Sequence, residues 1–337
     1  VLKTAISDLE VDQREVNSKL YYIKYQVENT KEFITIATTR PETMIGDTAI
    51  AVNPSDQRYK SFVGKNAVIP IIDRKIKIIE DEYADPEQGT GAVKITPAHD
   101  FNDYEVGQRN NLEVLNIFTE EGKLNENAPK QFYGMDRFEV RKKIIKLLID
   151  KDYFVKEENI KNKVPYGDRS NSVIEPYLTE QWFADAKKLS IKAKEIVKSK
   201  KINFFPENWS KTYFQWMDNI EPWCVSRQLW WGHQIPAWYG PDGKVFVEED
   251  EKTAKLKAKE FYKKNIDLKR DEDVLDTWFS SGLWPFATLG WPKKNEYLES
   301  FYPTSVLVTG FDIIFFWVAR MIMFGLEFLD REPFKDI

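Results

Sequence analysis

Apolar and polar residues alternate along several short stretches in the first half of the chain. Residues 21–37 and 66–80 follow a two-residue period, which is typical of β-strands with one buried face. Asp, Asn, Gly and Pro separate these stretches, and this punctuation predicts a barrel-like or sandwich-like sheet. We also expect helices over 99–111 and 137–151, the second with an apolar stripe. Residues of about 20–160 should therefore form one α+β domain.

The second half of the chain has a different pattern. Residues 161–180 are polar and rich in turn formers, so we expect a connector that leads into a helix over about 184–200. Further on, the apolar run Val306–Asp312 predicts a buried strand, and Ile313–Leu329 predicts the helix that follows it. A parallel nucleotide-binding sheet offers this arrangement at the carboxyl ends of its strands, although any strand–helix pair would show it too.

Composition narrows the classes of function. The 337 residues, of which 42% are hydrophobic, are enough for two or three domains. The single cysteine, Cys224, excludes an internal disulfide and a multi-cysteine zinc site, and it fits a cytoplasmic protein. With only two histidines, we expect no metal site. The net charge of −5 argues against a generally basic nucleic-acid binder, so any RNA contact must be local.

Membrane and targeting signals are not apparent. The most apolar run, Ile313–Leu326, contains Arg320 and is too short to cross a bilayer. We expect no signal peptide in this sequence. The abrupt ends at Val1 and Ile337 suggest cuts through a larger protein.

A lysine-rich run allows two interpretations. Seven lysines and one glutamate lie from Lys187 to Lys201. We favour a solvated helix face; the alternative is a patch that tracks the phosphates of a nucleic acid.

Candidate chemistry concentrates in residues 89–107, with the sequence GTGAVKITPAHDFNDYEVG. Residues 92–96 predict a short strand, and the residues after it can start a helix on which two aspartates share a face. A cation, a hydroxyl and two carboxylates would suit a small zwitterion such as an amino acid. The alternative is that the aspartates only cap the first helical turn, and spacing does not decide between the two. The four side chains are Lys94, Thr96, Asp100 and Asp103.

A resemblance decides between these alternatives. Residues 38–48, TTRPETMIGDT, follow the apolar strand Phe33–Ala37. Together with GTGAVKITPAHDFNDYEVG they resemble the editing domain of the valyl-tRNA synthetases, a family of class I aminoacyl-tRNA synthetases. WCVSRQLWWGHQIP at 223–236 and GFDIIFFW from Gly310 resemble the catalytic domain of that family. The likeness runs from Ala5 to the C-terminus.

The resemblance implies a multidomain α/β and α+β fold. A β-barrel-like editing domain with helices would accompany half of a Rossmann-type parallel sheet. Residues 1–20 would connect to the catalytic domain, 21–160 would form the editing domain, 161–208 the connector and Lys-rich helix, and 209–337 the second catalytic half. The His-Ile-Gly-His and Lys-Met-Ser-Lys-Ser type motifs of the family do not occur, so we do not expect the fragment to form an aminoacyl-adenylate.

The family ligates valine to tRNA(Val) with ATP as a substrate, and the implied partners are tRNA(Val), valine and misacylated threonine. We expect a cytoplasmic monomer without membrane association. Valine and threonine are nearly isosteric, so an apolar pocket cannot strongly reject the hydroxyl, as is established for this synthetase family. A second pocket must offer polar groups that threonine satisfies and valine leaves unpaired. We therefore expect hydrolysis of mischarged Thr-tRNA(Val).

The resemblance also assigns roles. Asp103 would hold the α-ammonium of the misattached amino acid, and Arg40 would grip the terminal adenosine of the tRNA and shape the water site. We expect Lys94, Asp103 and Thr39 to act closest to a water that attacks the ester, with the general base open; the terminal ribose hydroxyl could assist. Gln88 stands where some members carry an aromatic residue, which weakens any expectation of adenine stacking. The remaining expected contacts to the substrate are Thr38, beside Arg40, and Thr96 and Asp100, which with Lys94 line the threonine pocket.

In the catalytic half, Trp278, Ile313 and Trp317 match positions that wall the valine pocket. Gly310 and Asp312 match the contact to the ATP ribose. Ile313 and Trp317 could instead be ordinary helix packing. Two other functions stay open: a fragment that binds tRNA or amino acid without turnover, and a sibling synthetase for isoleucine or leucine.

Overall fold

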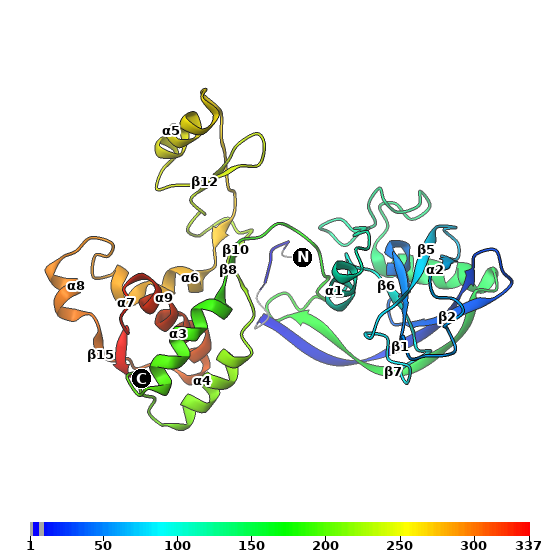
Figure 1. Ribbon diagram of the computed structural model, residues 1–337, viewed down its shortest axis with the longest axis horizontal. Coiled ribbons are helices and arrows are strands. Elements are labelled where there is room, and N and C mark those ends of the chain that lie inside the picture. The colour runs from blue at the N-terminus through cyan, green and yellow to red at the C-terminus, as the bar shows by residue number, and fades with distance from the viewer. Residues whose placement is uncertain (1–2, 7–9) are drawn as a thin grey trace. The chain divides into compact units, whose positions relative to one another are not determined.

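The computed structural model describes residues 3–6 and 10–337, and the chain divides into two compact units (Figure 1). The first unit comprises the described residues of Val1–Lys3 and Asp8–Glu180. The second comprises those of Thr4–Ser7 and Gln181–Ile337. Strands and helices mix in both, which confirms the expected mixed α/β fold class.

A seven-stranded sheet organises the first unit. The strands follow the order β2-β1-β4-β5-β3-β6, with β7 paired to β1, and all pairs are antiparallel except β3 with β5. The elements are β1 (Val11–Val27), β2 (Phe33–Thr38), the 3-10 helix η2 (Pro41–Gly46), β3 (Ala49–Val52), β4 (Asn66–Val68), β5 (Lys75–Glu80), β6 (Ala92–Ile95), α1 (Phe101–Arg109), α2 (Arg137–Asp150) and β7 (Phe154–Gly167).

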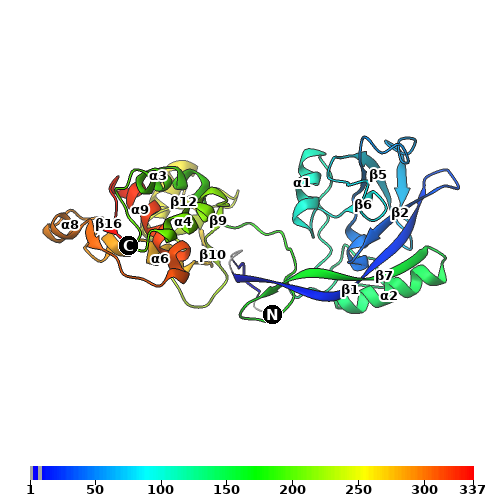
Figure 2. The same cartoon turned by 90° about the horizontal axis from the view of Figure 1, so that it is seen from below.

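The long strand β1 belongs to two structures. Its first part pairs with β7 as a twisted ribbon whose side chains are either exposed or half-buried, and its last part enters the sheet core (Figure 2). There Ile23, Tyr25 and Val27 are fully buried on alternate positions, as the sequence pattern predicts. The predicted apolar stripe of α2 is confirmed: Val140 and Ile144 pack in the same core.

The second unit gathers short strands around helices. Its core includes α3, α4 and α9 together with partly buried aromatic residues. The elements are β8 (Phe183–Ala184), α3 (Ala186–Lys198), α4 (Asn208–Asp218), β9 (Trp223–Cys224), β10 (Ser226–Arg227), β11 (Ala237–Tyr239), β12 (Val245–Val247), α5 (Glu251–Tyr262), β13 (Lys269–Arg270), β14 (Val274–Leu275), α6 (Thr277–Gly282), α7 (Trp284–Ala287), α8 (Glu296–Phe301), β15 (Thr304–Val306), the 3-10 helix η3 (Phe311–Ile313), the π-helix η4 (Ile314–Ala319), α9 (Arg320–Phe328) and β16 (Phe334–Asp336).

Parallel pairing in the second unit is local. Strands β15 and β16 pair in parallel, and Asn203 forms a parallel bridge to Asp336. The predicted buried strand Val306–Asp312 is wrong: β15 ends at Val306, and Val308 is 88% exposed. The strand stops because its ladder with β16 ends at the bond from the Leu307 N–H to the Asp336 carbonyl, 2.8 Å.

The predicted helix over Ile313–Leu329 is present, but it changes its winding. A π-helical stretch, η4, precedes the regular helix α9. Arg320 lies at the junction, buried, with its guanidinium carbon 3.9 Å from the centre of the Trp223 ring. Such wide turns inside helices occur often at functional sites because they re-aim side chains.

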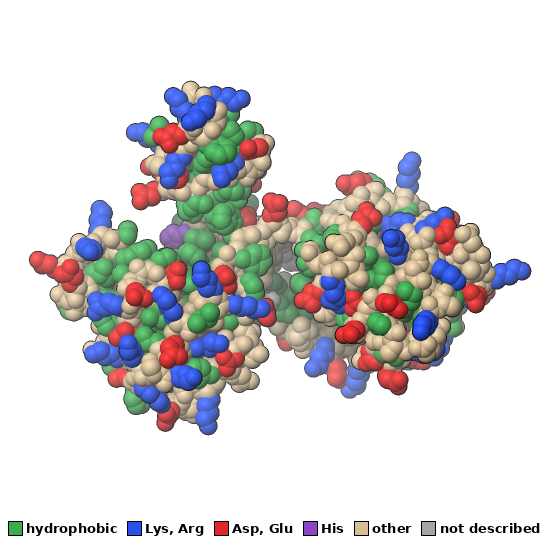
Figure 3. All heavy atoms as spheres, viewed as in Figure 1, with side chains coloured by type: hydrophobic (Ala, Val, Ile, Leu, Met, Phe, Trp, Pro, Cys, Tyr) green, Lys and Arg blue, Asp and Glu red, His purple; other side chains and the backbone are tan. Residues whose placement is uncertain are grey.

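The Lys-rich helix α3 has the character of a solvated face. Four of the seven lysines form surface ion pairs, which contribute little to stability. On the face shown in Figure 3, basic and acidic side chains are interspersed, with no single large basic patch. This favours the first of the two interpretations. The four pairs are Lys187–Glu221, Lys192–Asp330, Lys194–Asp218 and Lys200–Glu207.

Candidate functional site

The candidate site lies where β6 ends and α1 begins. Gly89 and Gly91 both have positive φ, +59° and +77°, and turn the chain into β6. The backbone angle at Gly91 favours glycine, and a β-carbon there would lie 2.4 Å from Arg58 Nη2, so the arginine side chain would have to move. Strand β6 then aligns with β3, which places Lys94 opposite Ile50.

Lys94 lies in a buried polar cluster with Thr96 and Asp47. The Lys94 ammonium donates to Asp47 Oδ1 at 3.1 Å and to Thr96 Oγ1, and Thr96 Oγ1 donates to Asp47 Oδ1 at 2.7 Å. The Tyr25 hydroxyl donates to the other Asp47 oxygen at 2.7 Å. Burial raises the pKa of Asp47, while Lys94 opposes that shift. The cluster fixes Lys94 and still leaves one of its three N–H donors without an acceptor among the described residues.

The side chain of Asp103 is linked to this cluster by the backbone N–H of Thr96. Its Oδ2 accepts the Thr96 N–H at 2.8 Å, and its side chain is buried. Its Oδ1 accepts no hydrogen bond from the described residues. Burial raises the pKa of Asp103 to about 7, an effect that Lys94 opposes and Asp100 reinforces. The carboxyl is thus poised to change charge near neutral pH.

Asp100 caps helix α1. Its Oδ1 accepts the N–H groups of Asn102 at 2.9 Å and Asp103 at 3.2 Å. The capping role predicted as the alternative therefore holds for Asp100. Asp103, one turn further, points its carboxylate back to Thr96 instead.

Close packing sets the position of α1. A β-carbon on Gly107 would lie 2.8 Å from Pro97 Cγ and 2.9 Å from Pro97 Cβ. The absence of a side chain at Gly107 lets the helix approach the end of β6, which brings Asp103 within reach of Thr96.

We expect Gly107→Ala to lower the free energy of unfolding of the first unit by about 1–3 kcal/mol through overpacking. In an exposed helix the same change would raise it by about 1 kcal/mol. Urea unfolding followed by circular dichroism measures the sign. Gln108→Ala, at the exposed neighbouring position, is the matched control; a stabilised Gly107→Ala variant would contradict the packing argument.

Arg40 occupies a second polar cluster in the first unit. Its backbone N–H donates to Thr38 Oγ1 at 3.1 Å, and its Nη1 donates to the His99 carbonyl at 2.8 Å. Its Nη2 bonds to Glu175, and its Nε lies 3.8 Å from Glu42. Burial lowers the pKa of Arg40 from its usual value, opposed by Glu42 and then by Asp100. Thr39, between Thr38 and Arg40 in the chain, is half-buried.

His99 is a neutral structural group. Its Nε2 accepts the Ile117 N–H at 3.0 Å, and burial together with Arg40 lowers its pKa to about 3. At neutral pH it carries no charge, and its Nε2 lone pair is engaged. It therefore offers no general base in the ground state.

Sequence reasoning missed Asp47, His99 and Glu175. Asp47 lies within TTRPETMIGDT and His99 within GTGAVKITPAHDFNDYEVG, so the motifs contained both residues. Glu175 lies in the turn-rich connector, where the sequence carries no signal that points to Arg40.

The second unit brings together part of the expected apolar pocket. Trp278 in α6 stacks on Phe316 at 5.2 Å between ring centres, and the Trp317 Nε1–H donates to the Ser281 carbonyl at 2.9 Å. Ile313 is the last residue of η3, and its side chain is half-buried. The two tryptophans thus flank the contact between α6 and η4, while this packing also gives them a structural role.

Gly310 and Asp312 lie exposed before η4. A β-carbon on Gly310 would lie 2.3 Å from Asp312 Oδ1, so glycine leaves room for that carboxylate to fold back on the loop. An exposed carboxylate next to bare backbone is able to accept hydrogen bonds from ligand hydroxyls.

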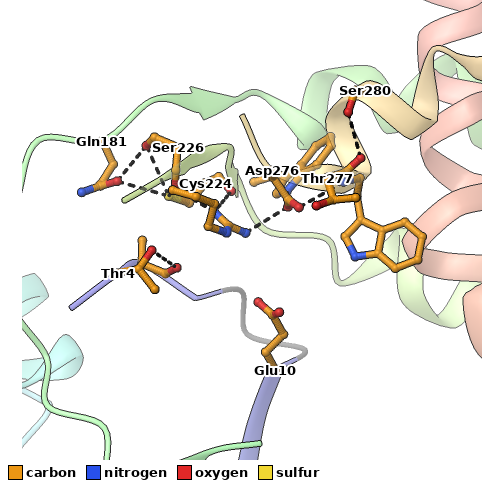
Figure 4. A network of polar contacts seen from close by, with 12 residues as sticks. Thr4, Glu10, Gln181, Cys224, Ser226, Asp276, Thr277 and Ser280 are labelled. Carbon is orange, nitrogen blue, oxygen red and sulfur yellow. Dashed lines mark hydrogen bonds and ion pairs between the residues drawn. The ribbon is translucent and has the colours of Figure 1, made fainter. Parts of the chain in front are cut away.

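A network of polar contacts surrounds Asp276 at the start of α6 (Figure 4). Asp276 caps α6 by accepting the Trp278 N–H at 3.1 Å. Its other oxygen accepts from Trp223 Nε1 and Arg227 Nη2, each at 2.9 Å. The hydroxyl of Ser226, the residue before Arg227, donates a hydrogen bond to Gln181 Oε1 at 2.7 Å. Asp276 is buried and was not among the predicted residues, although its position before an apolar helix is a capping signal.

Within residues 3–6 and 10–337, no group of three or more His, Cys, Asp or Glu side chains has the geometry to hold a metal ion. No helix of the same residues has both the length and the apolar character needed to cross a bilayer.

The chain was compared with protein families, curated proteins and solved structures. The family profile described as tRNA synthetases class I (I, L, M and V) matches residues 1–337. Valine–tRNA ligases are 79% identical over the whole chain in Pelagibacter ubique, 53% over 99% of it in Caulobacter vibrioides and 56% over all of it in Legionella pneumophila. The chain spans 38%, 39% and 36% of the length of these relatives. A solved ternary complex, Agrobacterium radiobacter K84 agnB2 LeuRS-tRNA-LeuAMS, covers 95% of this chain and 39% of its own at 16% identity, with a TM-score of 0.34.

Proposed function

The chain belongs to the class I tRNA synthetases of the isoleucine, leucine, methionine and valine group, and on that premise we propose that it is part of a valine–tRNA ligase that hydrolyses mischarged Thr-tRNA(Val). The high identity to valine–tRNA ligases favours valine over isoleucine or leucine as the amino acid. In the whole protein, ligation would use ATP, valine and tRNA(Val) as substrates. We assign residues 21–160 to editing and 209–337 to the second catalytic half.

One observation carries the editing proposal. Thr96 bonds to Lys94 through its side chain and to the buried Asp103 carboxylate through its N–H. Among the described residues, one N–H of the Lys94 ammonium and one oxygen of Asp103 have no partner. The Lys94 ammonium can donate to a threonine hydroxyl, and the Asp103 carboxylate can accept from an α-ammonium. Valine would leave the Lys94 donor unpaired in a buried site, which costs about 1–3 kcal/mol or more.

The proposed reaction is hydrolysis of the ester. A water attacks the carbonyl carbon, the bond to the ribose oxygen breaks, and threonine and the tRNA with a free terminal hydroxyl are released. Thr38, Thr39 and Arg40 hold the terminal adenosine and the water, and Lys94, Thr96 and Asp103 hold the amino acid. Since His99 is neutral and engaged, the base is left to the substrate's own ribose hydroxyl or to water.

The second unit supports a binding role for the amino acid and nucleotide in the whole protein. Trp278, Ile313 and Trp317 would wall the pocket for valine, and Gly310 with Asp312 would receive the ATP ribose. Asp276 would hold Trp278 in place.

The test is single-turnover deacylation of Thr-tRNA(Val) and Val-tRNA(Val) by the 337-residue chain. We expect the threonyl ester to be hydrolysed about 100-fold faster than the valyl ester, because only threonine pairs the buried donor. Background rates on both esters would reject the hydrolase and leave a fragment that binds without turnover.

A further inference from the structure

A carboxylate of the connector completes the Arg40 cluster. Five charged side chains alternate in sign, with three guanidinium groups and two carboxylates. Glu42 receives two bonds from Arg141, at 2.6 and 2.7 Å, and lies near Arg40. Glu175 bonds to Arg40 Nη2 through one oxygen and lies 3.2 Å from Arg137 Nε through the other. The sequence of charges is Arg137, Glu175, Arg40, Glu42 and Arg141.

Glu175 is mostly buried, and the backbone on its N-terminal side is fixed by hydrogen bonds. Its side chain is 14% exposed, and its neighbours in the connector are pinned to β7 and α2. The Ile174 N–H donates to the Pro165 carbonyl at 2.9 Å, and Arg137 Nη2 donates to the Val173 carbonyl at 3.3 Å. The carboxylate therefore arrives at Arg40 on a fixed backbone.

The two carboxylates act differently on Arg40. Glu42 is engaged by Arg141 and reaches the Arg40 guanidinium only at 3.8 Å, beyond hydrogen-bond range. Glu175 and the His99 carbonyl are the acceptors that hydrogen-bond its two terminal nitrogens. The plane of the guanidinium is thus set by Glu175 and His99. A guanidinium held in one plane presents its N–H donors in a fixed direction, which suits an oxygen-rich ligand such as a nucleotide phosphate.

We propose that Glu175 is a positioning residue that orients Arg40 to receive the terminal nucleotide of a mischarged tRNA. This inference rests on the proposed editing function. It extends the site beyond residues 38–103 to the connector, since the guanidinium keeps only its bond to the His99 carbonyl when its Nη2 partner is lost. Losing that partner weakens binding of the nucleotide and leaves Lys94, Thr96 and Asp103, which hold the amino acid, in place.

The experiment is a double-mutant cycle in the full chain, measured by deacylation of Thr-tRNA(Val). We expect Glu175→Gln to raise KM about tenfold with a smaller fall in kcat, because it removes the charge that holds the Arg40 guanidinium, whose contact to the nucleotide acts equally in ground and transition states. Glu175→Asp, which keeps the charge, should recover part of the loss. Glu180→Gln, an exposed carboxylate further along the same connector, is the matched control.

The decisive result comes from the Arg40→Ala background. If Glu175 acts through Arg40, Glu175→Gln has no further effect on KM once Arg40 is gone. If the two KM effects multiply, or if Glu175→Gln alone matches wild type, the inference is wrong while the editing function stands. A wild-type chain that hydrolyses neither ester overturns the editing function and this inference together.

Discussion

Asp103→Asn is expected to stabilise the first unit at pH 8 and to slow its hydrolysis of threonyl esters. In the folded chain the pKa of Asp103 is raised to about 7 by burial, against about 3.9 in an unfolded chain. Between these values the folded state keeps a proton that the unfolded state has released, so stability falls as the pH rises from about 4 to 7. Asparagine removes this penalty and can still accept the Thr96 N–H.

The expected gain at pH 8 is about 2–4 kcal/mol, and at pH 4 the variant and wild type should agree within about 0.5 kcal/mol. Urea unfolding at the two pH values measures both. Deacylation should fall about 100-fold, since removing one partner of a buried charge pair costs about 2–5 kcal/mol. Wild-type kcat/KM should rise with pH through about 7 as Asp103 ionises and fall again as the substrate ammonium loses its proton near 8. A variant that is destabilised at pH 8, or that keeps wild-type activity, would show that Asp103 is an ordinary helix residue.

Lys94→Met should cause the largest loss of stability. It leaves the Asp47 carboxylate fully buried without its cation, and breaking a buried pair in this way costs about 3–5 kcal/mol. Lys94→Met with Asp47→Asn should recover about 2 kcal/mol, because the amide can still pair with Tyr25 and Thr96. Lys77→Met, at an exposed position of β5, should change stability by less than about 0.5 kcal/mol.

The chain provides its own control for this measurement. All 11 tryptophans lie at Trp182 or beyond, so tryptophan fluorescence follows the second unit and circular dichroism follows both. We expect the circular dichroism transition of Lys94→Met to move to lower urea and the fluorescence transition to stay in place. Equal stability of the Lys94→Met variant and wild type would contradict the buried cluster.

The local elements were predictable because local patterns determine them. The alternation through Ile23, Tyr25 and Val27 predicted the strand that enters the core, and the spacing of Val140 and Ile144 predicted the buried face of α2. The spacing of apolar residues along a strand or a helix indicates which of its faces is buried, and this spacing is visible in a single sequence.

Contacts between distant segments were not predictable in the same way. Asp47 is 47 residues from Lys94, and Glu175 is 135 residues from Arg40. Asp47 lies within a motif that the sequence analysis singled out, but nothing local names the partner of either carboxylate, since only the fold of the sheet and the path of the connector bring them to Lys94 and Arg40. The error over Val306–Asp312 has a related cause: apolar composition suggested burial, but a strand also needs a neighbour to pair with, and its ladder is short.

The central claim is that one buried site forms hydrogen bonds with both the hydroxyl and the ammonium of threonine. Its most direct test is calorimetric binding of non-hydrolysable threonyl and valyl amide analogues of adenosine to the wild-type chain. The account predicts that the threonyl analogue binds about 100-fold more tightly, and that Asp103→Asn weakens the binding of both. Equal affinities for the two analogues would contradict it.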